Sequence, residues 1–148
     1  EGLKRIADYS ILNANYVQER LKGAFHVPYG DKRCMHEFVA SAAGFRDTDV
    51  HARDIAKALL NAGFHAPTMY FPLIVDEALM VEPTETESKE TLDAFCETML
   101  RFAKLARENP EELKRLDNLE VRHLDETHAA RNLNVRWTPP EQGAQRAE

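Results

Sequence analysis

The segment "TETESKETLDAFCETMLRFAKLA", residues 84–106, contains the clearest periodic pattern of the sequence. Its apolar residues recur every three or four positions, as on one face of an amphipathic helix; they are Leu92, Phe95, Cys96, Met99, Phe102, Ala103 and Ala106. Thr84 and Glu87 have the spacing of a capping box, and Pro110 follows the last periodic turn. The sequence therefore predicts a long helix from Thr84 to about Asn109 with one face packed against the domain.

Two further helices are predicted before this one. The apolar residues between Leu3 and Leu21 lie on one helical face, and Gly23 closes that segment. Asp49 is placed to cap a second helix, which ends at Asn61 through the left-handed backbone that Gly63 favours. A short helix is also predicted within residues 111–116, before a polar stretch that starts at residue 117.

The segments between these helices predict strands in pairs. Alternating or continuous apolar residues, bounded by turn residues, indicate strands within residues 24–29, 35–41, 68–75 and 78–82. The resulting order is helix, two strands, helix, two strands, helix. It predicts an α+β fold, a two-layer sandwich of a small, mostly antiparallel sheet with helices on one side.

Composition restricts the classes of partner. The 148 residues are 43% hydrophobic and 30% charged, and the formal net charge is −6. Binding of nucleic acid or anionic lipid through a basic face is not supported, because both require clustered lysine and arginine. No apolar run approaches the length of a membrane span. Cys34 and Cys96 lack the spacing of a zinc site or a disulfide framework, which favours reduced thiols and a cytoplasmic location.

Four residues are candidates for a binding site. His65 and Thr68 flank Pro67 in the apolar turn "GFHAPTMYFP", residues 63–72, and either they bond the backbone of their own turn or they face a ligand. Glu82 ends an apolar strand beside the expected start of a helix, where free amides favour an anion. Thr84 is explained by capping but lies in the same segment.

Other polar residues have plain structural explanations. His36 and Glu37 are expected within a strand, one side chain inward and the other in solvent, while Asn13 and Asn15 are expected to be solvated or to cap. The sequence contains no phosphate-binding glycine motif, and its histidines do not stand near Cys, Asp or Glu at a spacing typical of metal ligands. No metal ligands are therefore predicted.

Several segments together resemble a known family. They are "ILNANY" (residues 11–16), "HEFV" (36–39), "DIAKALLNAGFHAPTMYFP" (54–72) and "LMVEPTETESKETLDAFCETM" (79–99). They are similar to the C-terminal region of glycine dehydrogenase (decarboxylating), the P-protein of the glycine cleavage system, in particular subunit 2 of its split bacterial form. The chain starts at Glu1 directly in a helical pattern, which also favours a piece of a longer protein.

The resemblance implies a pyridoxal-phosphate (PLP) enzyme of the aspartate-aminotransferase fold. It implies a connecting helix over 1–22, a small C-terminal domain over 23–109 and a C-terminal extension over 110–148. The family binds PLP through a lysine that follows a histidine, and no His-Lys pair occurs here. In related enzymes an arginine on the strand before the last helix holds the substrate carboxylate, and residues 79–82 contain no arginine. The cofactor lysine is therefore expected upstream, and this chain alone is expected to be inactive.

The activity implied by the resemblance is release of CO2 from glycine and transfer of the aminomethyl group to the lipoyl arm of H-protein. The implied partners are H-protein and P-protein subunit 1, in a heterotetramer, with His65, Thr68, Glu82 and Thr84 at the mouth of the cleft. Two alternatives remain open at this stage. One is the small domain of another PLP enzyme of the same fold, and the other is a stand-alone binding module of ferredoxin-like build without catalysis.

Overall fold

The computed structural model describes residues 1–137 of the chain. Its elements are α1 (Gly2–Leu21), β1 (Phe38–Ser41), the 3-10 helix η1 (Ala43–Thr48), α2 (Ala52–Asn61), β2 (Thr68–Met69), β3 (Ala78–Val81), α3 (Lys89–Glu108), α4 (Pro110–Leu113) and α5 (Glu126–Arg131). The expectation of a C-terminal extension reaches residue 148, and its last part lies outside the described residues.

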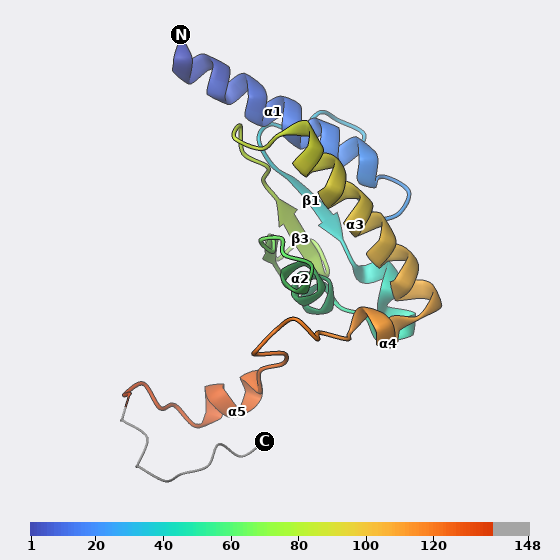
Figure 1. Cartoon of the computed structure of the whole chain (residues 1–148), viewed down its shortest axis with the longest axis vertical. Helices are drawn as coiled ribbons and strands as arrows, with labels where there is room; N and C mark the ends of the chain where they lie inside the picture. The colour runs from blue at the N-terminus through green and yellow to red at the C-terminus, as the bar shows by residue number, and fades with distance from the viewer. Residues whose placement is uncertain (138–148) are drawn as a thin grey trace.

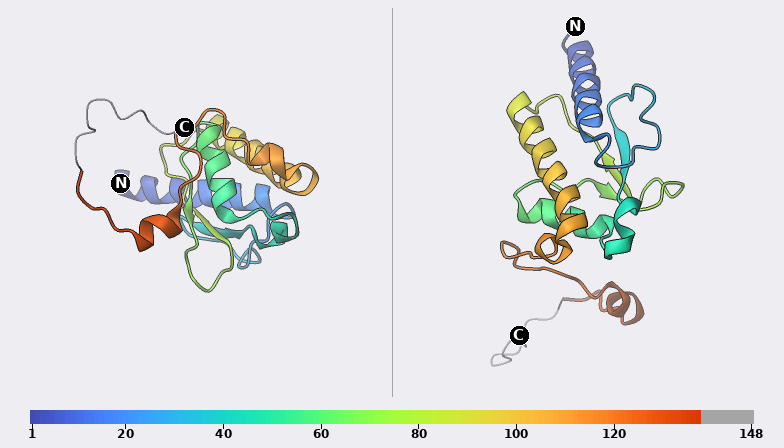
Figure 2. Two further views of the ribbon diagram at one scale, coloured as in Figure 1. Left: turned by 90° about the horizontal axis from the view of Figure 1, so that it is seen from below. Right: turned by 90° about the vertical axis from the view of Figure 1, so that its right-hand side faces the viewer.

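The three strands form one antiparallel sheet with β3 in the middle. Val81 pairs with Phe38 and Ala78 pairs with Ser41 across the β1–β3 ladder, and Met80 pairs with Thr68 on the other side. Figure 1 and Figure 2 show α2 and α3 on one side of this sheet, with α1 beside α3. The predicted α+β class with a small antiparallel sheet is therefore confirmed.

The core lies between the sheet and the helices, and the inner face of α3 supplies much of it. Six of the seven residues predicted for that face are buried: Leu92, Cys96, Met99, Phe102, Ala103 and Ala106. The seventh, Phe95, is only half-buried and packs against the core from its edge. The periodic pattern thus identified the helix and its orientation correctly.

The predicted apolar face of α1 is buried over only half of its length. Ala14, Val17 and Leu21 are buried, whereas Leu3 is 85% exposed. The first turns of α1 extend beyond the body of the domain in Figure 1, so no part of the described chain covers them. Exposed apolar side chains on these turns are Leu3, Ile6, Tyr9 and Leu12.

The strand predictions were too long. Residues 24–29 form no strand and contribute only isolated bridges, one of which joins His26 to Ser41; Pro28 follows closely and has no N–H to extend a ladder. The segment over 68–75 pairs only as Thr68–Met69, because Tyr70 takes a left-handed backbone with φ 60°. β1 begins at Phe38, so His36 and Glu37 precede the strand and do not alternate within it.

Two predicted N-caps were wrong. Asp49 adopts a left-handed backbone with φ 56° at the end of η1, and α2 instead starts after His51, whose N–H donates to the Asp54 carboxylate at 2.9 Å. Thr84 does not cap α3, which starts at Lys89 after Ser88; the Ser88 hydroxyl accepts from the Thr91 N–H at 3.2 Å.

The predicted helix ends were right. Gly63 has the expected positive φ of 86°, and the Phe64 N–H returns to the Leu59 carbonyl at 2.9 Å after the end of α2. Asn109 follows the last residue of α3, and its side chain accepts from the Glu112 N–H at the start of α4. Glycine and proline signals are local, which is why they fixed these positions.

Candidate functional site

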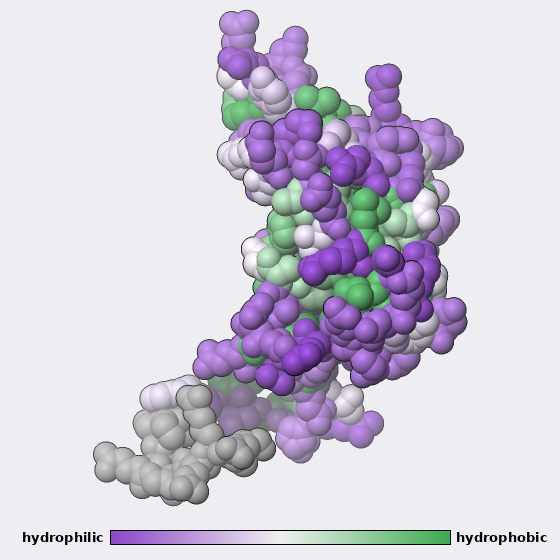
Figure 3. Space-filling view, turned by 45° about the vertical axis from the view of Figure 1, so that its right-hand side comes forward, coloured by the Kyte–Doolittle hydropathy of each residue, from purple (hydrophilic) through white to green (hydrophobic). Residues whose placement is uncertain are grey.

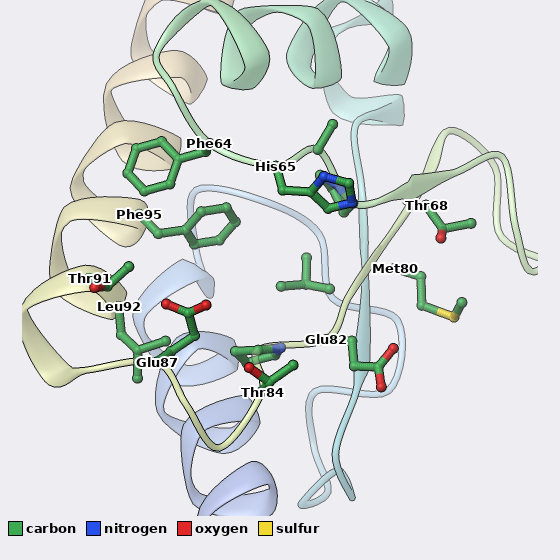
Figure 4. A pocket seen from close by; sticks show the side chains of 14 residues that line it. Phe64, His65, Thr68, Met80, Glu82, Thr84, Glu87, Thr91, Leu92 and Phe95 are labelled. Carbon is green, nitrogen blue, oxygen red and sulfur yellow. The ribbon is translucent and has the colours of Figure 1, made fainter.

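All four candidate residues line one hollow on the surface. His65 comes from the segment between α2 and β2 and Thr68 is the first residue of β2, while Glu82 and Thr84 come from the segment that follows β3. The hollow has a volume of about 340 Å³ and lies between these two segments and the N-terminal half of α3 (Figure 4). Segments distant in sequence therefore meet because β2 and β3 are neighbours in the sheet.

The walls of this hollow are mostly apolar. Phe64 and Phe95 meet edge to face, with ring centroids 5.7 Å apart and planes at 76°. Leu92, Met80 and Val81 complete the apolar surface from α3 and β3. Figure 3 shows apolar surface exposed in the middle of the body between hydrophilic ends. A ligand inside the hollow would therefore lie mainly against hydrocarbon.

Two polar side chains of the hollow were not among the sequence candidates. Glu87 was assigned to a capping box, but α3 starts after it, and Figure 4 shows its carboxylate directed into the hollow on the Phe95 side. Thr91, in the first turn of α3, also lines the hollow. The signal that could have found them is Ser88, which is also a suitable N-cap residue for α3. A helix that starts after Ser88 leaves Glu87 outside it.

Glu82 lies at the junction of two hollows. It also lines a second hollow of about 290 Å³ together with Ile11, Met35 and His36, and its Oε1 is 3.9 Å from His36 Nε2. Both side chains of this pair are more than half exposed. The expectation that Glu82 lies at a helix N-terminus is wrong, because α3 begins at Lys89.

Asn13 and Asn15 attach α1 to the loops around the hollows. The Asn13 amide donates to the Thr84 carbonyl at 2.8 Å, and Asn13 is buried. The Asn15 amide donates to the Cys34 carbonyl at 2.8 Å, and the Cys34 N–H returns a bond of 3.1 Å to Asn15. The expectation of solvated or capping asparagines was wrong, because both partners are distant in sequence and only the fold brings them close.

The hollow differs from a second polar region around Glu77, which we name the Glu77 cluster and define as Arg46, His51, Asp76 and Glu77. The buried Glu77 carboxylate accepts from the Ala52 N–H at 2.7 Å, lies 2.9 Å from His51 Nδ1, and is 3.5 Å from the Arg46 guanidinium. Arg46 also pairs with Asp76. These contacts join the end of the β2–β3 loop to the start of α2.

The contacts of the Glu77 cluster shift two pKa values. Burial alone would raise the pKa of Glu77, but the hydrogen bond from Ala52 and the contact with His51 outweigh it, so that this pKa lies below its ordinary value. The hydrogen bond to Glu77 raises the pKa of His51. Glu77 also has a left-handed backbone with φ 50°, unusual for a residue with a side chain. The cluster is thus a structural joint whose polar groups satisfy one another.

A third polar group joins α1 to α3. The Asp93 carboxylate accepts from the Tyr16 hydroxyl, from Arg20 at 2.9 Å and from Lys89 at 2.6 Å. Hydrogen bonds from Lys89 and Tyr16 lower the pKa of Asp93 to about 2. This group holds the two long helices side by side, and both carboxylate oxygens of Asp93 face a cation.

The described residues offer no arranged set of metal ligands and no membrane-spanning helix. Within residues 1–137, no three His, Cys, Asp or Glu side chains converge to hold a metal ion. None of the helices in the same residues combines the length and the apolar character that crossing a membrane requires. The fold and the hollow define a small α+β domain with an open, apolar, polar-rimmed site at one edge.

Comparison with known proteins places this domain in a family. The family model described as "Glycine dehydrogenase, C-terminal domain" matches residues 6–123. The chain therefore belongs to the family of glycine dehydrogenase C-terminal domains. The resemblance drawn from the sequence segments is confirmed.

Individual relatives give the same result. The chain is 58% identical over 139 residues to the probable glycine dehydrogenase (decarboxylating) subunit 2 of Caldanaerobacter subterraneus subsp. tengcongensis, a match to 93% of this chain and 28% of that relative. It is 49% identical over 142 residues to the protein of the same description from Chloroherpeton thalassium, over 95% of this chain and 29% of the relative. The chain thus spans less than a third of the length of these relatives.

Proposed function

We propose that the chain is the small C-terminal domain of a PLP-dependent glycine decarboxylase of the aspartate-aminotransferase fold. The whole enzyme would release CO2 from glycine and pass the aminomethyl group to the lipoyl arm of H-protein. The observation that carries the proposal is the meeting of His65, Thr68, Glu82 and Thr84 around one hollow, in a chain whose relatives are described as glycine dehydrogenases.

The proposed domain organisation assigns α1 to the connection with a larger domain. Residues 1–22 would form the connecting helix, residues 23–109 the small domain and residues 110–148 a C-terminal extension. The exposed apolar side chains of the first turns of α1, Leu3 and Leu12 among them, fit a helix that continues into another part of a longer protein. Burial of such a strip is favourable in proportion to the apolar area covered.

The residues of the hollow do not fit the binding of PLP by this chain. The cofactor requires a lysine amine and groups that hold a phosphate, and the residues that line the hollow include no lysine or arginine. The chemistry that PLP supplies, acceptance of an electron pair from the substrate, would therefore be provided by cofactor bound elsewhere in the whole enzyme. This chain would contribute walls and polar groups to the mouth of the cleft.

Each candidate residue has a distinct part in the proposal. His65 is exposed at the rim, and an imidazole there can donate a hydrogen bond from its ring N–H. Thr68 adds a hydroxyl from β2, and Thr84 and Glu82 form the opposite rim. Among the described residues, the His65 imidazole has no hydrogen-bond partner in the protein, so its polarity is available to a ligand.

Partners and location form part of the same proposal. The relatives are described as subunit 2, which supports a heterotetramer with P-protein subunit 1, and the lipoyl arm would be delivered by H-protein. Both cysteines, Cys34 and Cys96, are free thiols, which fits a reducing compartment such as the cytoplasm.

The test is exchange of labelled bicarbonate into the carboxyl group of glycine, measured with the whole enzyme and H-protein. His65→Ala should lower the exchange rate by about tenfold, the value of one lost hydrogen bond in a transition state, while the enzyme stays folded. His26→Ala, which changes an exposed histidine outside the hollow, should leave the rate unchanged. Wild-type exchange in a folded His65→Ala enzyme would remove His65 from the site.

A further inference from the structure

The charges around the hollow are of one sign. Of the fourteen residues that line it, only Glu82, Glu87 and His65 are ionisable, and none is lysine or arginine. The hollow therefore presents two carboxylates and one imidazole. A bound carboxylate or phosphate would meet repulsion here without a compensating cation, so the lining selects against anions.

The helix dipole does not reverse this preference. The first turn of α3 lies beside the hollow, and free N–H groups at a helix start attract anions. Here the Ser88 hydroxyl accepts from the Thr91 N–H. Hydrogen bonding by the Glu90 backbone N–H and by Ser88 lowers the pKa of the Glu90 carboxyl from its ordinary value. The start of α3 is thus already supplied with acceptors from the chain itself.

The apolar walls favour a ligand with a hydrocarbon stem and a cationic end. In Figure 4 the Glu87 carboxylate lies on the Phe95 side of the hollow, and Phe64 packs against Phe95 on the side away from Glu87. Aromatic rings attract cations through their quadrupole, and a carboxylate beside them adds direct charge attraction. The combination of aromatic wall, carboxylate and apolar floor is the chemistry that recognises alkylammonium groups.

We propose that this hollow binds an alkylammonium group at the end of an apolar arm, with Glu87 facing the charge and Phe64 and Phe95 facing the stem. The identification of this ligand as the amine end of a carrier arm, rather than as free glycine, rests on the proposed function. Glycine is a poor occupant, because its carboxylate would lie against Glu82 and Glu87 and it has no stem to contact the rings.

The site is tested by methyl NMR of the whole enzyme labelled at the methionine methyl groups. Met80 lines the hollow, and its signal is assigned by Met80→Leu, while the buried Met99 of α3 serves as an internal reference. Three probes of equal stem length are titrated: hexylammonium, hexanol and hexanoate. Hexylammonium should shift the Met80 signal at the lowest concentration, hexanol at a higher one and hexanoate not at all, and Met99 should stay unchanged.

Glu87→Gln identifies the carboxylate that provides the selectivity. It should weaken hexylammonium binding by about threefold, as expected for an accessible charge pair, and leave hexanol binding unchanged. Glu97→Gln is the matched control, because Glu97 is an exposed acid of α3 outside the hollow. Hexanoate binding equal to hexylammonium binding, no response at Met80, or equal responses in the two variants would each overturn the proposal.

Kinetics distinguish the source of the amine. In the exchange reaction hexylammonium should raise the apparent KM for H-protein and leave that for glycine unchanged. A rise for glycine alone would overturn the assignment to a carrier arm. This outcome is independent of the proposed role of His65. Normal exchange in His65→Ala would not affect the preference for hexylammonium that Glu87 provides and Met80 reports. Loss of that preference would not affect the result for His65.

Discussion

The Glu77 cluster and the hollow are both polar regions, but their polar groups have different partners. In the cluster the Glu77 carboxylate is bonded by Ala52 and His51 and approached by Arg46, all within the domain. At the hollow, Glu82 has one exposed neighbour at 3.9 Å, His65 lies at the exposed rim, and the Glu87 carboxylate is directed into the open hollow. A buried polar group must be satisfied by its own fold, whereas an exposed group on apolar walls is available to another molecule.

The largest difference between the regions should appear in packing. Phe102→Ala removes a buried ring from the core and should lower the free energy of unfolding by about 3–5 kcal/mol. Phe95→Ala removes a half-buried ring from the wall of the hollow and should cost about half as much, because part of its surface is already in water. Urea unfolding of the chain measures both. Equal losses would show that the hollow wall is as well packed as the core.

The next effect concerns the buried carboxylate. Glu77→Gln should lower the free energy of unfolding by about 2–3 kcal/mol, because it removes the charge that His51 and the Ala52 N–H face. Glu82→Gln, at the exposed rim, should change it by less than about 0.5 kcal/mol. If the two variants unfold at the same urea concentration, the contrast between a satisfied and an open region is wrong.

A smaller effect is expected where the segment after β3, at the rim of the hollow, is joined to α1. Asn13→Ala leaves the Thr84 carbonyl without its donor and should cost about 1–2 kcal/mol. Ser10→Ala, one turn earlier on an exposed hydroxyl that bonds only its own helix, should cost less than about 0.5 kcal/mol. Both are compared by thermal unfolding, and a Ser10→Ala loss as large as that of Asn13→Ala would mean that the contact with Thr84 contributes nothing.

The smallest effect is the pH dependence of the Glu77 cluster. Glu77 has a lowered pKa, so its contribution is present above its ordinary value of 4.5 and is lost as the pH falls through the folded value. His51 has a raised pKa, so its contribution is complete below 6.5 and is lost as the pH rises through the folded value. Both contributions are complete between pH 4.5 and 6.5.

Stability should therefore be highest in that interval and fall by less than about 1 kcal/mol above it, since His51 is partly exposed. Urea unfolding at a series of pH values measures this, and Glu77→Gln should flatten the alkaline side. An unchanged alkaline slope in Glu77→Gln would show that Asp49, the other carboxylate near His51, governs its protonation.

The boundaries of the helices show how far local signals reach. Gly63 and Asn109 marked helix ends correctly, because a left-handed residue and a following proline act on their immediate neighbours. Thr84 and Asp49 failed as caps, because several residues nearby could serve and the tertiary fold chose Ser88 and His51 instead. Competing local signals of similar strength are decided by contacts that the sequence does not display.

The site shows the same division between local and distant information. The turn at residues 63–72 and the segment at 82–84 were each recognisable as unusual, and the four candidate residues chosen from them all line the hollow. Glu87 was missed because a local capping pattern explained it. The Glu77 cluster was missed altogether, because its members come from η1, the start of α2 and the end of the β2–β3 loop, and no spacing in the sequence relates them.

By itself the sequence determined the three long helices, the buried face of α3, the α+β class and the family, since these depend on periodicity and on residues close together in the chain. Only the tertiary structure decided that the Glu77 carboxylate is buried, that the Glu87 carboxylate is open to the hollow, and that the Asn13 amide donates to the Thr84 carbonyl. The physical reason is that burial and hydrogen bonding of a polar side chain depend on what the sheet and helices bring beside it, and those neighbours lie many residues away.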